Sequence, residues 1–447
     1  MILGNSLLDL ANFAEEELIG ENSKFKSISI DTRKINKGDI YVSIKGVNFD
    51  GDDFIDEAFS KGAIACITEK KLDSKIRHIT VKDTLNFLKD LGAYQRKLFL
   101  GQVFCITGSN GKTSTKDILS HILETEGSTH KTFENQNNLL GLSLTFLGLK
   151  DQDFLVAEIG TNAPGEIIEL SSLVYPDIAI ITNIGLSHAE GLGSLEEIAI
   201  EKSNMLYSLG HKGIAILPRD SDFYDLWATK FKGNKIITFG VHSESNFRVS
   251  DIQVDLANSK TSFTLFYLEE SINCIINTIG EHNALNAAAA LAAVHSSGLD
   301  LKIATRRLES AVFPSRRLSV KKGFKGSMII DDSYNANPES MKAALKELAI
   351  DTRKHKVFIG GQMAELGPKE AIYHQEILHF ADNIVDEIWC IGDLWKQEIN
   401  LKNSSLKIFS NSTELLDYAF KHISRDWIIL LKGSRSSAID QIADNLQ

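Results

Sequence analysis

The stretch Val103-Phe104-Cys105-Ile106-Thr107-Gly108-Ser109-Asn110-Gly111-Lys112-Thr113 decides the fold of this chain. Its first five residues predict a buried strand, and the residues after Lys112 predict a helix that runs to about residue 126. Between them, glycines let backbone N–H groups turn toward a phosphate, and the start of the helix adds a favourable dipole. Lys112 is suited to neutralise the β- and γ-phosphates, and the Thr113 hydroxyl to hold Mg²⁺. The stretch therefore predicts the phosphate loop of an ATP-dependent enzyme.

This loop lacks one glycine of the general phosphate-loop pattern, because Ile106 stands where the first glycine is expected. The alternative interpretation is an ordinary glycine turn between a strand and a helix. The strand before the loop, the helix after it and the pair Lys112-Thr113 favour the phosphate loop.

Short apolar runs alternate with helical stretches through most of the chain, which predicts the α/β class with largely parallel sheets covered on both faces. A looser alternation over residues 247–279 predicts an antiparallel segment, and an alanine-rich helix is expected over residues 283–295. A chain of 447 residues exceeds one ordinary core, and the pattern predicts three domains over residues 1–98, 99–312 and 313–447. The predicted strands cover residues 40–44, 63–68, 103–107, 154–159, 178–183, 213–217, 235–239, 328–332, 356–360, 387–391 and 427–431.

Composition narrows the classes of function. The formal net charge of −11 disfavours binding to nucleic-acid phosphates. The four cysteines contain no CxxC pair and are expected to be buried free thiols. The N-terminus lacks the basic residue of a signal peptide, and no apolar run approaches the length of a membrane span. We therefore expect a cytoplasmic protein that is not embedded in a membrane and has no nucleic-acid partner. A monomer is also expected, although none of these features bears on the oligomeric state.

Polar side chains stand at the ends of predicted strands, where open α/β sheets bind ligands. Glu158 interrupts an apolar strand, and a buried carboxylate there needs a cation, either nucleotide-bound Mg²⁺ or a nearby lysine. His188 follows the next strand, in a loop of small residues. Beside a phosphate loop at the same sheet edge, this histidine is predicted to be a metal ligand instead of an ordinary loop residue. Lys202, on the following helix, is by itself typical of a solvated surface.

The later part of the chain adds further polar candidates. Asn283 and Asn286 open the alanine-rich helix, where they are suited either to contact adenine or to cap the helix. The run Asp331-Asp332-Ser333-Tyr334-Asn335-Ala336-Asn337-Pro338 follows a strand, with Asn337 and Pro338 suited to start the next helix. Arg316 and Arg317 follow a predicted hinge at Phe313-Pro314 and are placed to reach a γ-phosphate. Lys432-Gly433-Ser434-Arg435 forms a basic turn suited to a carboxylate.

Together these motifs resemble the Mur ligase family over the whole length of the chain. The resemblance points to the members that add D-alanyl-D-alanine to UDP-N-acetylmuramoyl-tripeptide. It rests on the phosphate loop, on Ala157-Glu158-Ile159-Gly160-Thr161-Asn162, Thr182-Asn183-Ile184-Gly185-Leu186-Ser187-His188, Glu281-His282-Asn283, the run from Asp331 to Pro338, and Met363-Ala364-Glu365-Leu366-Gly367. In the N-terminal part, Ser29-Ile30-Asp31-Thr32-Arg33 and Lys45-Gly46-Val47-Asn48-Phe49-Asp50-Gly51 look like the family's uridine-nucleotide segments.

The resemblance implies a small α/β domain that binds the UDP-sugar peptide, a central phosphate-loop ATPase domain, and a C-terminal Rossmann-like domain that binds the amino substrate. The implied reaction couples ATP and Mg²⁺ to peptide-bond formation through an acyl phosphate of the tripeptide. The C-terminal domain is expected to close over ATP.

The resemblance also implies roles for individual residues. The predicted catalytic residues are Lys112, Lys202 (as a carbamate), His188 and Arg316, and the predicted metal ligands are Thr113, Glu158, His188 and Lys202. The predicted ATP-binding residues are Gly108, Ser109, Asn110, Gly111, Lys112, Thr113, Ser114, Asn283, Arg316 and Asp332. The predicted substrate-binding residues are Ser29, Asp31, Arg33, Lys45, Asp50, Asn137, Asn138, Thr161, Asn162, Tyr334, Asn335, Glu365, Lys432 and Ser434.

The chain departs from the family pattern at two positions. Gln362 stands where an aspartate is common, which puts an acidic role there in doubt, and Thr161 replaces a usual alanine. Two alternatives remain open: another ligase of the family, including the folylpolyglutamate type, and a nucleotide switch that makes no bond. Asn36-Lys37-Gly38-Asp39 matches a guanine-reading tetrapeptide, but it precedes the phosphate loop and is interpreted as a turn.

Overall fold

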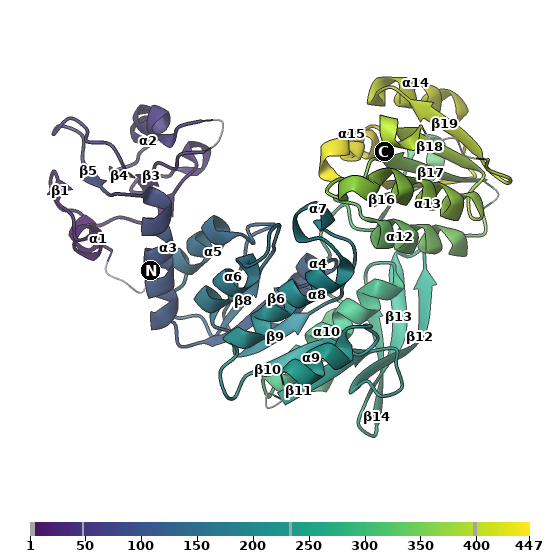
Figure 1. Ribbon diagram of the computed structural model, residues 1–447, viewed down its shortest axis with the longest axis horizontal. Helices are drawn as coiled ribbons and strands as arrows, with labels where there is room; N and C mark the ends of the chain where they lie inside the picture. The colour runs from purple at the N-terminus through teal and green to yellow at the C-terminus, as the bar shows by residue number, and fades with distance from the viewer. Residues whose placement is uncertain (1–4, 47–48, 232–234, 354, 397–399) are drawn as a thin grey trace. The chain divides into compact units, whose positions relative to one another are not determined.

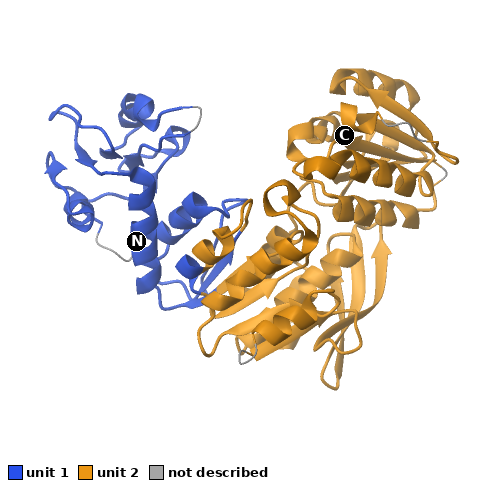
Figure 2. Cartoon of the chain, viewed as in Figure 1, with its two compact units in different colours: residues 1–103, 127–159, 172–175 blue, residues 104–126, 160–171, 176–447 orange. Residues whose placement is uncertain are grey.

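The computed structural model describes residues 5–46, 49–231, 235–353, 355–396 and 400–447, which fold into two compact units (Figure 2). Unit 1 consists of Met1–Val103, Gly127–Ile159 and Ser172–Tyr175, and unit 2 of Phe104–Glu126, Gly160–Ser171 and Pro176–Gln447. Val47 and Asn48 of the predicted uridine segment lie outside the described residues. No described helix combines the length and apolar character needed to cross a membrane.

Unit 1 contains a small sheet with strand order β1-β5-β4-β3-β2, in which only β1 pairs antiparallel (Figure 1). Helices α1 and α3 bury apolar side chains against it, among them Leu10, Leu88 and Leu91. The elements are α1 (Leu7–Ala14), β1 (Leu18–Ile19), β2 (Ile28–Ser29), η1 (Thr32–Lys34), β3 (Ile40–Val42), η2 (Gly51–Phe54), α2 (Ile55–Ser60), β4 (Ala65–Thr68), β5 (His78–Thr80) and α3 (Thr84–Leu98). The two strands predicted in this part are thus present but shorter.

Unit 1 also holds the parallel pair β7 (Thr129–Lys131) and β8 (Phe154–Glu158), together with α5 (Leu139–Leu147). Asn138 caps α5 by accepting a hydrogen bond from Gly141 N at 2.9 Å. Strand β8 is apolar up to its last residue, Glu158, and it is buried from Leu155 through Glu158. The predicted strand over residues 154–159 is therefore confirmed, one residue shorter.

The first sheet of unit 2 has the strand order β14-β13-β12-β11-β10-β9-β6. The strands from β6 to β12 run parallel, and β12, β13 and β14 form the predicted antiparallel segment. Its elements are β6 (Gln102–Thr107), α4 (Lys112–Leu123), α6 (Glu166–Val174, whose end belongs to unit 1), β9 (Ile178–Ile181), α7 (Ala189–Leu192), α8 (Leu195–Ser203), η3 (Asn204–Ser208), β10 (Ile214–Pro218), α9 (Tyr224–Lys230), β11 (Lys235–Gly240), β12 (Phe247–Asp255), β13 (Lys260–Tyr267), β14 (Glu270–Ile276), α10 (Glu281–Ser296) and α11 (Leu301–Leu308).

The alanine-rich helix α10 packs on α4 and on the neighbouring strands β10, β11 and β12. Ala287–Ala290 are fully buried, because their small side chains let backbones approach closely from several sides. The helix begins at Glu281, two residues before the predicted start. Asn283 therefore lies inside the helix and does not cap it.

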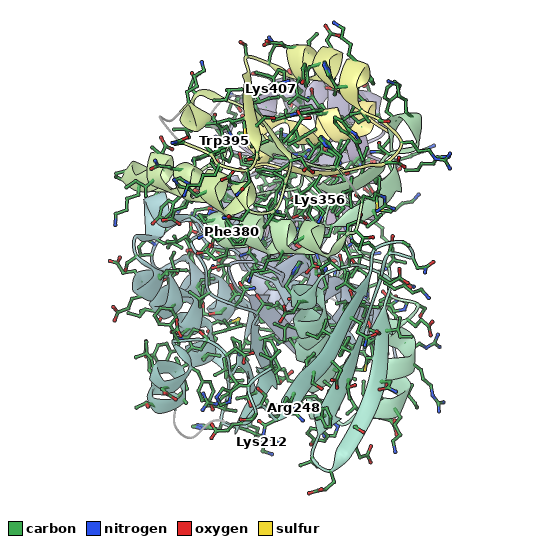
Figure 3. All side chains as sticks on the ribbon, turned by 90° about the vertical axis from the view of Figure 1, so that its right-hand side faces the viewer. Lys212, Arg248, Lys356, Phe380, Trp395 and Lys407 are labelled. Atoms are coloured by element: carbon green, nitrogen blue, oxygen red, sulfur yellow. The ribbon has the colours of Figure 1, made fainter. Side chains whose placement is uncertain are left out.

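The second sheet of unit 2 has the order β15-β16-β20-β17-β18-β19, with only β15 antiparallel. Alternate residues of β17 enter two separate cores: Phe358 packs with α12 and α13, whereas Val357 and Ile359 pack with α14 and α15. Trp395, which is labelled in Figure 3, is fully buried and belongs to the first core. The elements are β15 (Ser319–Lys322), η4 (Phe324–Gly326), β16 (Met328–Asp332), α12 (Pro338–Ile350), β17 (His355–Gly361), η5 (Gly367–Lys369), α13 (Glu370–Asp382), β18 (Glu387–Ile391), η6 (Asp393–Trp395), β19 (Ser405–Phe409), α14 (Ser412–His422), β20 (Trp427–Lys432), η7 (Arg435–Ser437) and α15 (Ile439–Asn445).

The four cysteines are free and buried, as predicted. Burial raises the pKa of the Cys66 and Cys274 thiols to about 12, so they stay protonated at neutral pH. These cysteines are packing residues.

Candidate active site

The turn from β6 into α4 is made by glycines at its two tightest points. Gly108 has a φ of 150° and Gly111 a φ of 78°. A Cβ on Gly108 would collide with Thr182 Oγ1, and one on Gly111 would collide with the side chain of Asn286. The predicted phosphate loop is therefore closed by backbone at these two points, and it leads into the first N–H groups of α4, which have no partner within the helix and can shape an anion site.

Residues that follow β9 hold this loop in place. Ser109 Oγ donates to Gly185 O at 2.8 Å and accepts from Gly185 N at 2.9 Å. Asn110 N donates to Asn183 Oδ1 at 2.8 Å, and Thr182 Oγ1 donates to Asn110 O at 2.6 Å. The predicted strand over residues 178–183 ends at Ile181 for this reason: the next residues turn their polar groups to the loop. Sequence reasoning noted the motif but missed this function.

Lys112, the first residue of α4, folds its amine back over the loop. Its Nζ donates to Gly108 O at 2.8 Å and to Ser109 O at 3.2 Å. Thr113 and Ser114 follow in the first helical turn, where Ser114 is buried. The loop thus presents a lysine and a hydroxyl at the start of a helix, which is the arrangement that binds phosphate.

Three basic side chains of unit 2 converge near the loop. The pKa of His188 is lowered mainly by burial, against the opposing effect of Glu365, and the charges of Lys112 and Lys202 lower it further. The pKa of Lys202 is lowered well below its usual range by burial and then by Lys112, with Glu201 opposing. Basic groups that lower one another's pKa in this way favour an anion between them.

Lys202 is not the surface residue that its type alone suggests. Its side chain is only 1% exposed, and within the described part of the chain its amine has no ion pair. A buried, unpaired ammonium is costly, so the neutral amine is the favoured form. A neutral amine is also the form that reacts with carbon dioxide, which is consistent with the predicted carbamate.

His188 lies against Glu365. His188 Nδ1 is 2.5 Å from Glu365 Oε2, and Glu190 N donates to Glu365 O at 3.1 Å. His188 and Glu365 have φ values of 54° and 61°, which non-glycine residues seldom adopt. Glu365, predicted to bind substrate, therefore contacts the predicted metal ligand His188.

The segment that carries Glu365 is fixed from both sides. Ser434 donates through N and Oγ to Gln362 O at 3.0 and 2.6 Å, and Met363 N donates to His374 Nε2 at 2.9 Å. With its amide oxygen turned to the start of η6, Gln362 also accepts from Asp393 N and Leu394 N at 3.1 and 2.8 Å. Gln362 thus has a structural role that needs no negative charge, and Ser434 is engaged in holding it.

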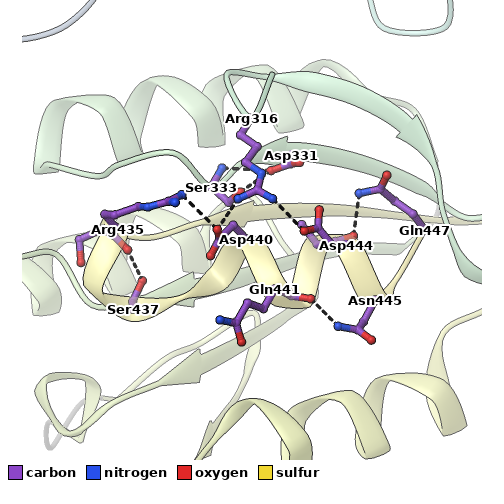
Figure 4. Close-up of polar contacts among 12 residues, drawn as sticks. Arg316, Asp331, Ser333, Arg435, Ser437, Asp440, Gln441, Asp444, Asn445 and Gln447 are labelled. Atoms are coloured by element: carbon purple, nitrogen blue, oxygen red, sulfur yellow. Dashed lines mark hydrogen bonds and ion pairs between the residues drawn. The ribbon is translucent and has the colours of Figure 1, made fainter. Parts of the chain in front are cut away.

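The side chains of the adjacent residues Arg316 and Arg317 point in different directions. Arg317 Nη2 donates to Thr113 Oγ1 at 3.2 Å, and its guanidinium lies 4.1 Å from the centre of the Tyr334 ring. Arg316 instead pairs with Asp440 and Asp444 of α15 (Figure 4). Successive side chains point apart, and the acids of α15 attract Arg316. The prediction that Arg316 faces the phosphates is therefore revised: at the loop the structure has Arg317.

Asp332 and Lys432, predicted to bind ATP and a substrate carboxylate, contact each other. They are register partners at the ends of β16 and β20, and Lys432 Nζ lies 2.5 Å from Asp332 Oδ2. Lys432 Nζ also donates to Asn335 O at 3.0 Å, and Leu318 N donates to Asp332 Oδ1 at 3.1 Å. Because both charges are largely buried, this ion pair holds the sheet edge together, and Lys432 has little capacity left for a second carboxylate.

The run from Asp331 to Pro338 reaches the phosphate loop. Asn337 caps α12 and Pro338 follows at its first turn, as predicted. Asn337 Nδ2 also donates to Asn110 Oδ1 at 2.9 Å. Asn335 Oδ1 accepts from Ala336 N, which keeps that side chain in its own turn.

Asn283 and Asn286 are buried and linked. Asn283 Nδ2 donates to Ile279 O at 2.8 Å, and Asn286 Nδ2 donates to Asn283 Oδ1 at 3.3 Å. Asn286 lies against Gly111. The capping interpretation is wrong for Asn283, because α10 starts at Glu281; the adenine contact stays a prediction.

In unit 1 the first predicted uridine segment forms a local turn. Arg33 pairs bidentately with Asp31 through Nε and Nη2, each at 2.9 Å, and this hydrogen bonding is the main cause that lowers the pKa of Asp31. Ser29 Oγ donates to Asp31 O at 3.0 Å. Arg33 is exposed, so the turn presents a guanidinium held in a fixed direction.

The remaining predicted residues of unit 1 lie in two places. Lys45 pairs through its backbone with Asp50, and Lys70 Nζ lies 3.1 Å from Asp50 Oδ2. Glu158 is buried, and Asn137 Nδ2 donates to Glu158 Oε1 at 3.0 Å. Asn137 and Glu158, predicted separately, are thus brought together.

Mg²⁺ was predicted on Thr113, Glu158, His188 and Lys202. Within the described residues, no group of three or more His, Cys, Asp or Glu side chains could hold a metal ion. Mg²⁺ usually keeps its waters and takes one or two protein ligands beside substrate phosphates. The Thr113 hydroxyl fits a metal that arrives with a nucleotide, whereas the neighbouring amine of Lys112, which lies over the loop, does not suit a metal bound without one.

Three family models match consecutive parts of the chain: the Mur ligase family catalytic domain over residues 24–95, the Mur ligase middle domain over 106–294, and the Mur ligase glutamate ligase domain over 316–435. A UDP-N-acetylmuramoyl-tripeptide–D-alanyl-D-alanine ligase of Buchnera aphidicola is 35% identical over 99% of this chain and 96% of its own. The chain belongs to the Mur ligase family.

Solved Mur ligases have the same fold. A MurF from Acinetobacter baumannii matches with a TM-score of 0.89 and 30% identity, covering 98% of this chain and 97% of its own. A MurF ligase from Thermotoga maritima, solved in complex with ADP, matches with a TM-score of 0.82 and 27% identity, covering 94% and 96%. The predicted family and the predicted three-domain α/β fold are confirmed; the exact boundaries at 98/99 and 312/313 stay predictions.

Gly108→Ala tests whether the loop of this Mur ligase is closed by backbone alone. We expect Gly108→Ala to destabilise the fold more than Gly298→Ala, because both positions have positive φ but only Gly108 would place its Cβ on a neighbour. Gly298→Ala should cost about 1 kcal/mol, the penalty of the backbone conformation alone. Urea denaturation of both variants measures the difference, and equal losses would contradict the proposed packing.

Proposed function

We propose that this Mur ligase joins D-alanyl-D-alanine to UDP-N-acetylmuramoyl-tripeptide with hydrolysis of ATP to ADP and phosphate. The observation that carries the proposal is the convergence of Lys112, Lys202 and His188 beside a glycine-closed loop. Lys112, at the start of helix α4, supplies positive charge for transfer of a phosphoryl group. Relatives named for this reaction match almost the entire chain, which supports the choice of substrates.

The reaction proceeds in two steps. An oxygen of the tripeptide's terminal carboxylate attacks the γ-phosphorus of ATP, the bond from that phosphorus to ADP breaks, and an acyl phosphate forms. The amino group of D-alanyl-D-alanine then attacks the acyl carbon, loses a proton, and phosphate leaves with the former carboxylate oxygen. The first step is needed because a carboxylate oxygen is a poor leaving group and phosphate is a good one.

The residues of the chain act chiefly by position and charge. Lys112 would release its hold on the loop carbonyls and neutralise the transferred phosphoryl group. Lys202, as a carbamate, would carry a negative charge in place of its amine, and His188 would sit beside it. When bound with the nucleotide, Mg²⁺ supplies positive charge to the phosphates, with the Thr113 hydroxyl as a ligand. Glu158, in unit 1, stays a predicted ligand.

We transfer the role of the phosphate-facing arginine from Arg316 to Arg317. The Nη2 contact with Thr113 and the stacking on Tyr334 support this choice. Arg317 Nε is also buried without a hydrogen-bond partner among the described residues, so it has a donor left for an oxygen of the phosphate.

The function is tested by release of phosphate from ATP, measured with both substrates present and with each omitted in turn. We expect release only when the tripeptide nucleotide and D-alanyl-D-alanine are both present, and its loss in Lys112→Ala. Release that does not depend on D-alanyl-D-alanine would point to a sister ligase with another amine substrate. Nucleotide binding without substrate-dependent release would point to a switch.

Arg317→Ala and Arg316→Ala form a matched pair for the arginine assignment. We expect Arg317→Ala to lower kcat by about 100-fold or more, the cost of removing one donor that stabilises charge in a transition state. Arg316→Ala should mainly lower the melting temperature, because it breaks the pairs with Asp440 and Asp444. Steady-state kinetics beside thermal melts separate the two; the reverse pattern would restore Arg316.

A further inference from the structure

Glu201 is a buried carboxylate that the proposed reaction does not use. It lies on α8 directly before Lys202, and it is 5% exposed. Glu201 Oε2 accepts from Gly165 N at 3.0 Å and Oε1 accepts from Ile167 N at 2.9 Å. Asn204 Nδ2 adds a third donor at 3.1 Å. These donors satisfy both oxygens, which offsets the cost of burying the charge.

The two backbone donors belong to the start of α6 and to the loop that precedes it. The first N–H groups of a helix have no partner within the helix, and a carboxylate there is also favoured by the helix dipole. The loop, residues 160–165, has a second anchor, because Glu166 Oε2 accepts from Asn162 N at 2.6 Å and from Ala163 N at 3.2 Å. Of the two anchors, only Glu201 comes from another helix.

This loop carries two predicted substrate-binding residues. Thr161 is buried and its Oγ1 donates to Ala163 O at 2.8 Å, whereas Asn162 is exposed. Successive residues of a helix point about 100° apart, so Glu201 and Lys202 face different directions. Glu201 holds the loop, while Lys202 lies close enough to Lys112 for their charges to interact. Helix α8 therefore connects the loop to the phosphate site.

We propose that Glu201 is a positioning residue that holds loop 160–165, with Thr161 and Asn162, at a fixed place relative to Lys202 and the phosphate loop. This inference rests on the ligase reaction proposed above. In that reaction, the position of loop 160–165 relative to the phosphate loop sets where the carboxylate of the tripeptide meets the γ-phosphate. Glu201 itself touches neither substrate. A carboxylate is required because each of its two oxygens must accept a hydrogen bond from a different backbone N–H.

Glu201→Gln is the informative variant, since it keeps the size of the side chain but turns an N–H₂ group toward one backbone N–H. Loss of one hydrogen bond to a buried charged group corresponds to about 10-fold or more in an equilibrium. We expect the KM for UDP-N-acetylmuramoyl-tripeptide to rise by about 10-fold or more, with the KM for ATP nearly unchanged. Glu196→Gln, an exposed glutamate on the same helix, is the matched control and should behave as the wild type.

Hydrogen exchange of the peptide that covers residues 160–167 gives a readout that does not need activity. We expect faster exchange there in Glu201→Gln and not in Glu196→Gln. Equal KM values for the two variants, or a parallel rise for ATP and tripeptide with a lower melting temperature, would overturn the positioning role. If the wild-type protein does not turn over these substrates, the proposed function is contradicted. The anchoring role is then tested by hydrogen exchange alone, and unchanged exchange of residues 160–167 in Glu201→Gln would overturn it.

Discussion

The tight turn between β6 and α4 is the constraint on which the rest of the site depends. It leaves no room for a Cβ at Gly108 or Gly111, so the loop has no side chains of its own to hold it at these points. Rigidity comes from outside, through Thr182 and Asn183 at the end of the neighbouring strand. An anion site made of backbone N–H groups works only if the backbone is fixed, and the parallel sheet supplies the fixing by bringing two strand ends together.

Buried charges in this protein differ in whether they have a partner of opposite sign. Where an acid and a base can pair, as Asp332 and Lys432 do, they hold the fold together. Beside the phosphate loop, burial and then the charge of Lys112 lower the pKa of Lys202 well below its usual range. An anionic ligand offsets the cost of burying basic groups next to one another. The arrangement that is unfavourable without a ligand therefore favours binding of a phosphate.

The fold was largely predictable from the sequence, because buried parallel strands appear as continuous apolar runs. The glycines of the loop were predictable as well, since a tight turn from strand to helix leaves no room for a side chain. The site was predictable only in part. Periodicity cannot tell which of two adjacent arginines faces the loop, since that depends on where Asp440 and Asp444 lie in the fold. It also cannot show that Lys432 is already paired, or that Glu201 reaches a distant helix. Such partnerships join residues far apart in the chain, and only the tertiary structure brings them into contact.

The central claim is that the carboxylate of the tripeptide is activated by direct phosphorylation. UDP-N-acetylmuramoyl-tripeptide labelled with ¹⁸O in that carboxylate, incubated with ATP and D-alanyl-D-alanine, tests it most directly when the released phosphate is analysed by mass spectrometry. An acyl phosphate intermediate predicts one ¹⁸O atom in each phosphate released during peptide-bond formation. Unlabelled phosphate would mean that water, and not the carboxylate, attacks ATP, and would contradict the account.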